Sequence, residues 1–112
     1  MSTSRRRKMT KFRTLRLKEG DLKYPSGRRY YGLADMDGDK ATVIVNPVIR
    51  AHRDEKELLN TYAHEAVHLG DWMALRSRTN KRDGELTETE VQTIADHVAE
   101  VLWKAGYRRT IK

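Results

Sequence analysis

The second half of the chain carries two stretches in which apolar residues recur every three or four positions, the spacing of amphipathic helices. Each stretch opens with a capping box, the first starting at Asp54 and the second at Thr87. The spacing predicts helices that run from these residues to about Arg76 and to Gly106, a residue suited to the left-handed end of a helix. The expected core faces are Leu58, Leu59, Tyr62, Ala66, Leu69 and Met73 in the first helix and Val91, Ile94, Ala95, Val98, Leu102 and Ala105 in the second.

Shorter stretches in the first half have the alternation and composition of β-strands. Phe12–Lys18 alternates apolar and polar residues, whereas Arg29–Ala34 and Ala41–Val45 are rich in Tyr, Val and Ile. Asp35–Asp39 is typical of a hairpin loop between the last two strands, with Gly38 supplying a positive φ. The alternate aspartates of this loop also fit a calcium site, but the rest of the EF-hand pattern is missing. We therefore expect an α+β fold, with a small antiparallel sheet of about three strands and two long helices.

Length and composition limit the class of protein. A chain of 112 residues forms one domain with a modest core. The absence of Cys excludes disulfides and thiolate metal ligands. Because no apolar run has the length of a membrane span and the N-terminus lacks the apolar stretch of a signal peptide, we expect a cytoplasmic protein with no membrane partner.

The excess positive charge is confined to the N-terminus. Residues 1–18 contain eight Lys or Arg and no acidic residue, whereas residues 19–112 contain fifteen basic and sixteen acidic residues. We therefore expect residues 1–10 to form a disordered basic arm and residues 11–112 to form the folded domain. The arm could bind the phosphates of a nucleic acid or an acidic partner, or it could be a solvated tail.

His64-Glu65-Ala66-Val67-His68 follows the H-E-x-x-H pattern of zinc hydrolases. On a helix, His64 and His68 lie one turn apart on the same face, where two imidazoles can bind one zinc ion. Glu65 points beside that position and can take a proton from a water molecule. A random order of these residues gives the pattern in roughly one chain in a hundred. Both histidines lie off the expected core face, with Thr61 and Asp71, so an exposed helix surface is the plainer alternative, although it leaves the intervening Glu unexplained.

A catalytic zinc ion usually has three protein ligands and one open position for water. The second expected helix offers four candidates for the third ligand: Glu88, Glu90, Asp96 and His97. Glu90 already belongs to the capping box, whereas Glu88 has no local role, so we favour Glu88 and keep Glu90 as the alternative. Asp71 lies about 10 Å along the helix axis from His64, at a rise of roughly 1.5 Å per residue, which suits a hydrogen bond to an imidazole N–H rather than a bond to the metal.

With Glu88 as the third ligand, the sequence resembles the gluzincins, zinc metallopeptidases in which H-E-x-x-H is followed by a Glu on the next long helix at thermolysin-like spacing. It departs from them at Gln92, where that family has an Asp four residues after the Glu ligand, but Gln92 could still accept a hydrogen bond from a histidine N–H. Ile44–Pro47 before the first helix and Leu102–Arg108 at the end of the second also resemble small metallopeptidase-like proteins of phage and bacterial genomes. The similarity covers about residues 41–109.

The resemblance implies a minimal zincin-like, metal-binding domain that holds Zn²⁺ with His64, His68 and Glu88. It implies hydrolysis of a peptide or amide bond in a polypeptide substrate, with Glu65 as the general base. The substrate would lie along an exposed strand edge, for which Ala41–Val45 is the candidate. Candidate donors to the oxyanion are His52, Tyr62, His97 and Tyr107. If a phage encodes the protein, its expected location is the host cytoplasm.

Two other functions fit the sequence. One is a nucleic-acid-associated or regulatory protein, in which the basic arm binds and the zinc site is structural or vestigial. The other is a helical interaction domain in which the motif is incidental. Stoichiometric zinc in the purified protein would exclude the second, and zinc-dependent hydrolysis would exclude the first.

Overall fold

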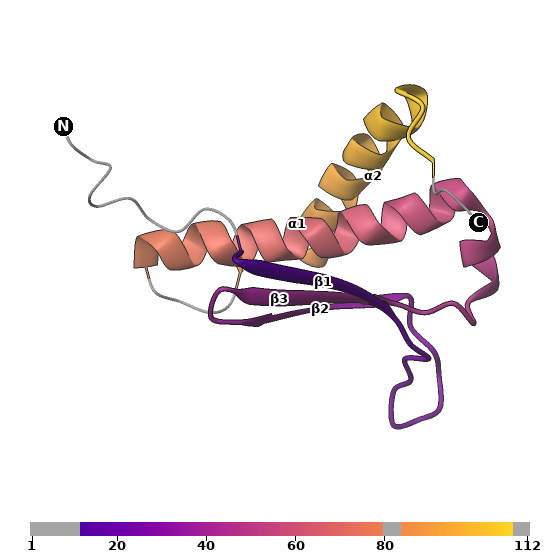
Figure 1. The fold of residues 1–112 in the computed structure, drawn as a ribbon, viewed down its shortest axis with the longest axis horizontal. Coiled ribbons are helices and arrows are strands. Elements are labelled where there is room, and N and C mark those ends of the chain that lie inside the picture. The colour runs from indigo at the N-terminus through magenta and orange to yellow at the C-terminus, as the bar shows by residue number, and fades with distance from the viewer. Residues whose placement is uncertain (1–11, 80–83, 109–112) are drawn as a thin grey trace.

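The computed structural model describes residues 12–79 and 84–108 of the chain (Figure 1). The predicted basic arm, residues 1–10, lies outside these ranges. The regular elements are the strands β1 (Thr14–Glu19), β2 (Gly32–Asp37) and β3 (Lys40–Val45), the short 3₁₀ helix η2 (Arg50–Arg53), and the helices α1 (Glu55–Thr79) and α2 (Glu88–Lys104). The predicted α+β fold with three strands and two long helices is therefore confirmed. No helix in the described ranges combines the length and the apolar character that a bilayer span requires.

The three strands form one sheet in the order β1-β3-β2. β2 and β3 form an antiparallel hairpin, whereas β1 pairs in parallel with β3. The sheet is therefore mixed, and the prediction of an antiparallel sheet was wrong on this point. The connection of residues 20–31 explains the difference, because it carries the chain away from β1 and leaves the place beside β1 for β3.

The β2–β3 hairpin turns at Gly38 and Asp39. Gly38 has a φ of 62°, as the sequence predicted. The turn is tighter than expected, because Asp35–Asp37 continues β2 instead of forming the loop. β2 correspondingly begins at Gly32, later than predicted, since the two-residue turn fixes the register and pairs Gly32 with Val45.

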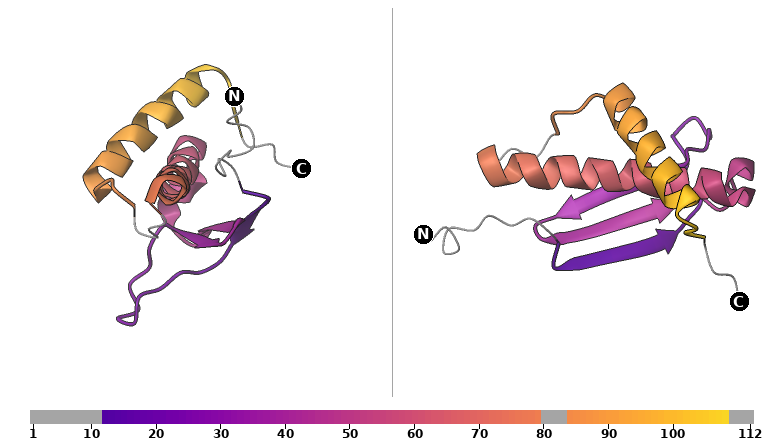
Figure 2. Two further views of the ribbon diagram at one scale, coloured as in Figure 1. Left: turned by 90° about the vertical axis from the view of Figure 1, so that its left-hand side faces the viewer. Right: turned by 90° about the horizontal axis from the view of Figure 1, so that it is seen from above.

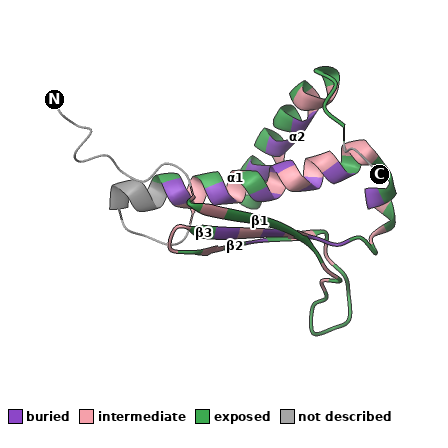
Figure 3. Cartoon of the chain, viewed as in Figure 1, coloured by how far each residue is buried: buried purple, intermediate pink, exposed green. Residues whose placement is uncertain are grey.

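Both helices lie on the same side of the sheet, with α1 against the sheet and α2 against the opposite side of α1 (Figure 2). The sheet and α1 enclose a first cluster of buried apolar residues, which comprises Ala34, Ala41, Val43, Val45, Leu58 and Leu69. The two helices enclose a second cluster, which comprises Ala63, Ala95 and Ala99. α1 thus carries buried residues toward the sheet and toward α2, and buried segments recur along the part of the helix that is coloured in Figure 3.

This two-sided burial differs from the single core faces that the sequence predicted. Ala66, expected in the core, is exposed, whereas Thr61 and Glu65 are buried. On α2, Ile94 is 41% exposed although it was expected in the core, and the next residue, Ala95, is fully buried. Alanine suits the crossing because its small side chain lets two helix axes approach closely. Apolar periodicity alone does not distinguish such a contact from a face of larger side chains.

Both helices begin at the predicted residues, but only α2 has the full capping box, because the backbone N–H of Asp54 donates to Ala51 O and not to the Glu57 side chain. Asp54 Oδ1 accepts hydrogen bonds from two backbone N–H groups in the first turn of α1, at 2.8 and 3.4 Å. Thr87 and Glu90 form the reciprocal capping box at the start of α2. Gly106, with a φ of 94°, follows α2 in the predicted left-handed conformation. The capped start of α2 carries Glu88, its first residue.

We predict that Ala95→Leu destabilises the protein by about 1–3 kcal/mol, because the larger side chain does not fit the close contact between α1 and α2. Urea unfolding at pH 7 measures this free energy. Ile94→Ala is the matched control on the same helix, and it should cost less than half as much because Ile94 is 41% exposed, whereas Ala95 is fully buried. The opposite order would mean that α2 packs against α1 through the side that carries Ile94 and not through the side that carries Ala95.

Candidate metal centre

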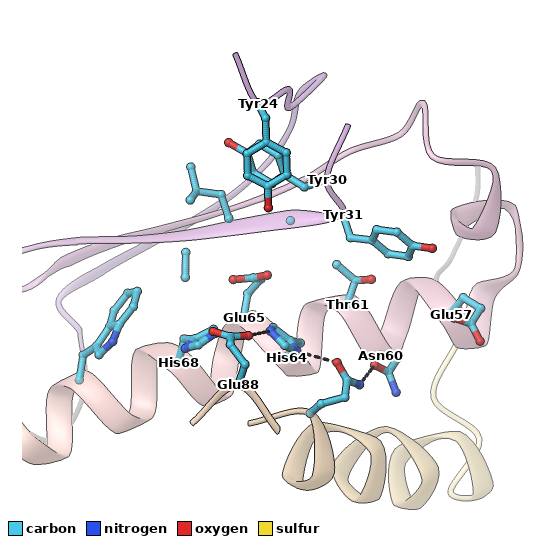
Figure 4. A pocket seen from close by; sticks show the side chains of 15 residues that line it. Tyr24, Tyr30, Tyr31, Glu57, Asn60, Thr61, His64, Glu65, His68 and Glu88 are labelled. Carbon is cyan, nitrogen blue, oxygen red and sulfur yellow. Dashed lines mark hydrogen bonds and ion pairs between the residues drawn. The ribbon is translucent and has the colours of Figure 1, made fainter. Parts of the chain in front are cut away.

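The two histidines of the H-E-x-x-H motif lie near the middle of α1, on the arc between its sheet-facing side and its α2-facing side. At about 100° per residue, His64 and His68 lie between Glu65, which faces β2, and Ala63, which faces α2. They therefore face a cleft of about 740 Å³ between β2, α1 and the start of α2 (Figure 4). The cleft explains why they lie off the expected core face without being exposed.

Glu88, in the first turn of α2, brings its carboxylate to both imidazoles. Its Oε1 lies 3.2 Å from His64 Nε2, and its Oε2 lies 3.0 Å from His68 Nε2. The histidine side chains are 19% and 16% exposed, whereas that of Glu88 is 74% exposed. In the described ranges, this is the one group of at least three His, Asp or Glu side chains that could hold a metal ion. It includes neither Glu90 nor the aspartates of the β2–β3 hairpin.

A hydrogen-bond network fixes the orientation of the His64 ring. The side-chain nitrogen of Gln92 donates to Asn60 Oδ1 at 2.9 Å and to Asp96 Oδ1 at 2.7 Å. Asn60 Nδ2 also donates to Asp96 Oδ1, at 2.7 Å, and these bonds from Asn60 and Gln92 hold the pKa of Asp96 below its ordinary value. With both of its N–H groups engaged, Gln92 presents its Oε1 to His64 Nδ1, at 2.8 Å. Because an amide oxygen can only accept a hydrogen bond, the donor is His64 Nδ1, which therefore carries a hydrogen.

When the His64 ring is neutral, this tautomer leaves a lone pair on Nε2 that faces the Glu88 carboxylate. Two electron-rich atoms at this distance repel each other unless a cation, either a proton or a metal ion, lies between them. Zinc bonds of about 2.1 Å at tetrahedral angles separate two ligand atoms by about 3.4 Å, close to the two observed N–O distances. The chemistry and spacing of the donor atoms thus fit a zinc ion.

Asp71 has a different role from the one predicted. We expected its carboxylate to accept a hydrogen bond from an imidazole, but it accepts from the backbone N–H groups of Glu85, at 3.0 Å, and Leu86, at 3.1 Å. The ring of His68 instead stacks against Trp72, with 5.6 Å between ring centroids and 26° between planes. Gln92 is the residue that contacts an imidazole N–H, as the departure from the gluzincin pattern suggested.

Glu65 is buried between α1 and β2, on the sheet side of the histidines (Figure 4). Burial raises the pKa of its carboxyl from the ordinary 4.5 to about 7, with a lowering contribution from His64 and a further raising contribution from Glu88. A carboxyl group with this pKa can both accept and release a proton near neutral pH. Sequence reasoning placed Glu65 beside the histidines but did not foresee its burial.

Gly32, the first residue of β2, makes room for the Glu65 carboxylate. A Cβ atom at this position would lie 3.0 Å from Glu65 Oε2 and 3.0 Å from Thr61 Cγ2. Any other residue would therefore displace Glu65 or push β2 away from α1. Thr61 is itself held by His52, whose Nε2 lies 2.8 Å from Thr61 Oγ1 and whose Nδ1 lies 2.7 Å from Asn46 O. The backbone of β2 thus forms one wall of the pocket around Glu65.

The walls of the cleft differ from the sequence expectation. Its lining includes Tyr24, Tyr30, Tyr31, Leu33 and Trp72. His52, Tyr62, His97 and Tyr107, considered above as donors, are not among the described residues that line it. The strand beside the cleft is β2, which lies at an edge of the sheet, whereas the strand proposed for the substrate, Ala41–Val45, lies at the centre. The tyrosines were missed because they precede β2, and only the sheet register brings this connection to the cleft.

Comparison with known proteins adds nothing to this geometry. The chain matches no protein-family model, no curated protein and no solved structure.

We predict that Glu65→Gln stabilises the metal-free protein at pH 8 by about 4 °C or more in Tm, but hardly at pH 4.5. Because the pKa of Glu65 is higher in the folded than in the unfolded chain, its protonated form contributes stability at low pH, and this contribution is lost as the pH rises through about 7. Thermal unfolding in EDTA across this pH range measures the effect. Glu57→Gln, at an exposed position of the same helix, is the control for removal of a charge. Equal shifts for the two variants at every pH would contradict the prediction.

Proposed function

We propose that the protein is a zinc-dependent peptidase, with His64, His68 and Glu88 as the metal ligands and Glu65 as the general base. The observation that carries the proposal is the convergence of the two His Nε2 atoms on the Glu88 carboxylate, with the Nδ1 atom of His64 engaged by Gln92. An incidental motif on an exposed helix would not require a carboxylate from a second helix or a network that fixes a tautomer.

The second support is the contrast between the two glutamates of the site. The Glu88 side chain is 74% exposed, and its carboxylate lies against the imidazole nitrogens. Glu65 is buried, its pKa is raised to about 7, and it faces β2. Two carboxylates with such different surroundings suit two different roles, a ligand and an acid–base group.

A bound zinc ion would supply Lewis acidity toward the scissile carbonyl and would acidify the attacking water. Glu65 would take a proton from that water and deliver it to the leaving amine nitrogen, a role that its raised pKa suits. Gln92 and Asp96 keep the proton of His64 on Nδ1 throughout. The aromatic residues along the cleft would hold an extended polypeptide beside the exposed edge of β2 and limit access of bulk water.

We predict that the purified protein retains about one zinc ion after dialysis and that His64→Ala or His68→Ala lowers its affinity for zinc by 100-fold or more. Glu88→Ala should lower the affinity by at least about 10-fold. Glu90→Ala is the matched control, because Glu90 lies in the same helical turn as Glu88 but its carboxylate belongs to the capping box. Competition with a chromophoric chelator at pH 7 gives the ranking. If Glu90→Ala weakens binding more than Glu88→Ala, Glu90 is the ligand.

We further predict that Glu65→Gln binds zinc as tightly as the wild-type protein and loses hydrolysis by about 10²–10⁴-fold, the usual contribution of a general base. The substrate is a mixture of denatured proteins, and mass spectrometry counts the new peptide ends. Wild-type protein in EDTA sets the background rate. Full activity of Glu65→Gln would remove Glu65 from the mechanism, and cleavage that persists in EDTA would remove the metal.

A further inference from the structure

Asp71 connects the end of the histidine-bearing stretch of α1 to the segment that precedes α2. Its two carboxylate oxygens accept hydrogen bonds from successive backbone N–H groups, Oδ1 from Glu85 at 3.0 Å and Oδ2 from Leu86 at 3.1 Å. Thr87, the N-cap of α2, follows directly, and Glu88 is the first residue of the helix. The bonds therefore hold the chain two and three residues before the carboxylate that faces the histidines.

Gly84 makes this contact close. A Cβ atom at position 84 would collide with Asp71 Oδ2 and would lie 2.9 Å from Trp72 Cδ1. The backbone at Gly84 therefore rests directly on the Asp71 carboxylate and on the indole that stacks against His68. A residue with a side chain could not occupy this position without moving one of those groups.

We propose that Asp71 and Gly84 form a latch, defined as the contact between these two residues and the backbone of Glu85 and Leu86, whose role is to position Glu88 for metal binding. Asp71 is a positioning residue and not a ligand, since its carboxylate faces backbone N–H groups. The inference rests on the zinc site proposed above and identifies the contact that positions its third ligand, Glu88.

The need for such a latch follows from the exposure of Glu88. Its side chain is 74% exposed, and it reaches the histidines from a separate helix. The buried residues Val91, Ala95 and Ala99 anchor α2, but all three lie beyond Glu88 along the helix. Apparent affinity for a ligand falls in proportion to the fraction of molecules whose site is assembled. Without the latch, the first turn of α2 can leave that arrangement, and zinc affinity falls accordingly.

The test compares the zinc affinities of Asp71→Ala and Asp54→Ala by chelator competition. Both variants remove a carboxylate that accepts hydrogen bonds from two backbone N–H groups near the start of a helix. Asp54, however, caps the start of α1, ten residues before His64. Asp71→Ala should weaken zinc binding by about 10-fold, within the range for residues that support metal ligands. Asp54→Ala should keep the wild-type affinity even though it loses stability. Gly84→Ala, which leaves the carboxylate in place, should weaken binding in the same direction as Asp71→Ala.

A double-mutant cycle then tests whether the latch acts through Glu88. In the Glu88→Ala background, Asp71→Ala should cause no further loss of zinc affinity, because the ligand that it positions is gone. An equal loss in both backgrounds would show that Asp71 acts on the histidines and would overturn the proposal. So would wild-type affinity in Asp71→Ala.

The failure of the latch is distinct from the failure of the proposed function. A wild-type protein that binds zinc, together with an unchanged Asp71→Ala variant, rejects the latch and leaves the peptidase proposal standing. A wild-type protein that binds no zinc rejects both. Latch variants that lose zinc in a protein without hydrolytic activity would support the latch and assign it to a structural metal site.

Discussion

The close packing of α2 against α1 is the interaction on which the rest of the site depends. Ala63 on α1 and Ala95 and Ala99 on α2 let the two helices meet with little between them. That contact brings Glu88 within reach of the two Nε2 atoms and Gln92 within reach of His64 Nδ1. A larger side chain at the crossing would separate the two halves of the donor group even if every donor were kept.

The pKa values of two carboxyl groups near the histidines are shifted in opposite directions. The Glu65 carboxyl is removed from water, and this raises its pKa to about 7. Asp96, only one hydrogen bond beyond the histidine partner Gln92, is exposed and is kept ionised by its bonds to Asn60 and Gln92. The carboxyl with the raised pKa is thus buried beside β2, whereas the carboxylate that holds Gln92 is exposed to solvent, where a permanent charge costs little.

Local features of the fold could be predicted from the sequence because each depends on residues close together in the chain. The capping residues Asp54 and Thr87, the turn at Gly38 and the shared helix face of His64 and His68 are of this kind. The order of the strands could not be predicted, because β1 and β3 pair through backbone hydrogen bonds that do not depend on a particular residue pattern in either strand. The role of Asp71 was missed for a related reason: helical geometry gives its place on α1 but not the backbone that meets it.

The division of the site between the two helices also affects when it can form. The β2–β3 hairpin and α1 are made of contacts between residues close together in the sequence, which cost little chain entropy to form. The donor set needs a carboxylate and an amide from α2, which leaves the ribosome after the histidines have been made. A chain in which α2 is not docked therefore has the H-E-x-x-H motif without Gln92 and Glu88 in place beside it. The group of donor atoms is complete only when α2 is docked against α1, so formation of the group reports that this tertiary contact is in place.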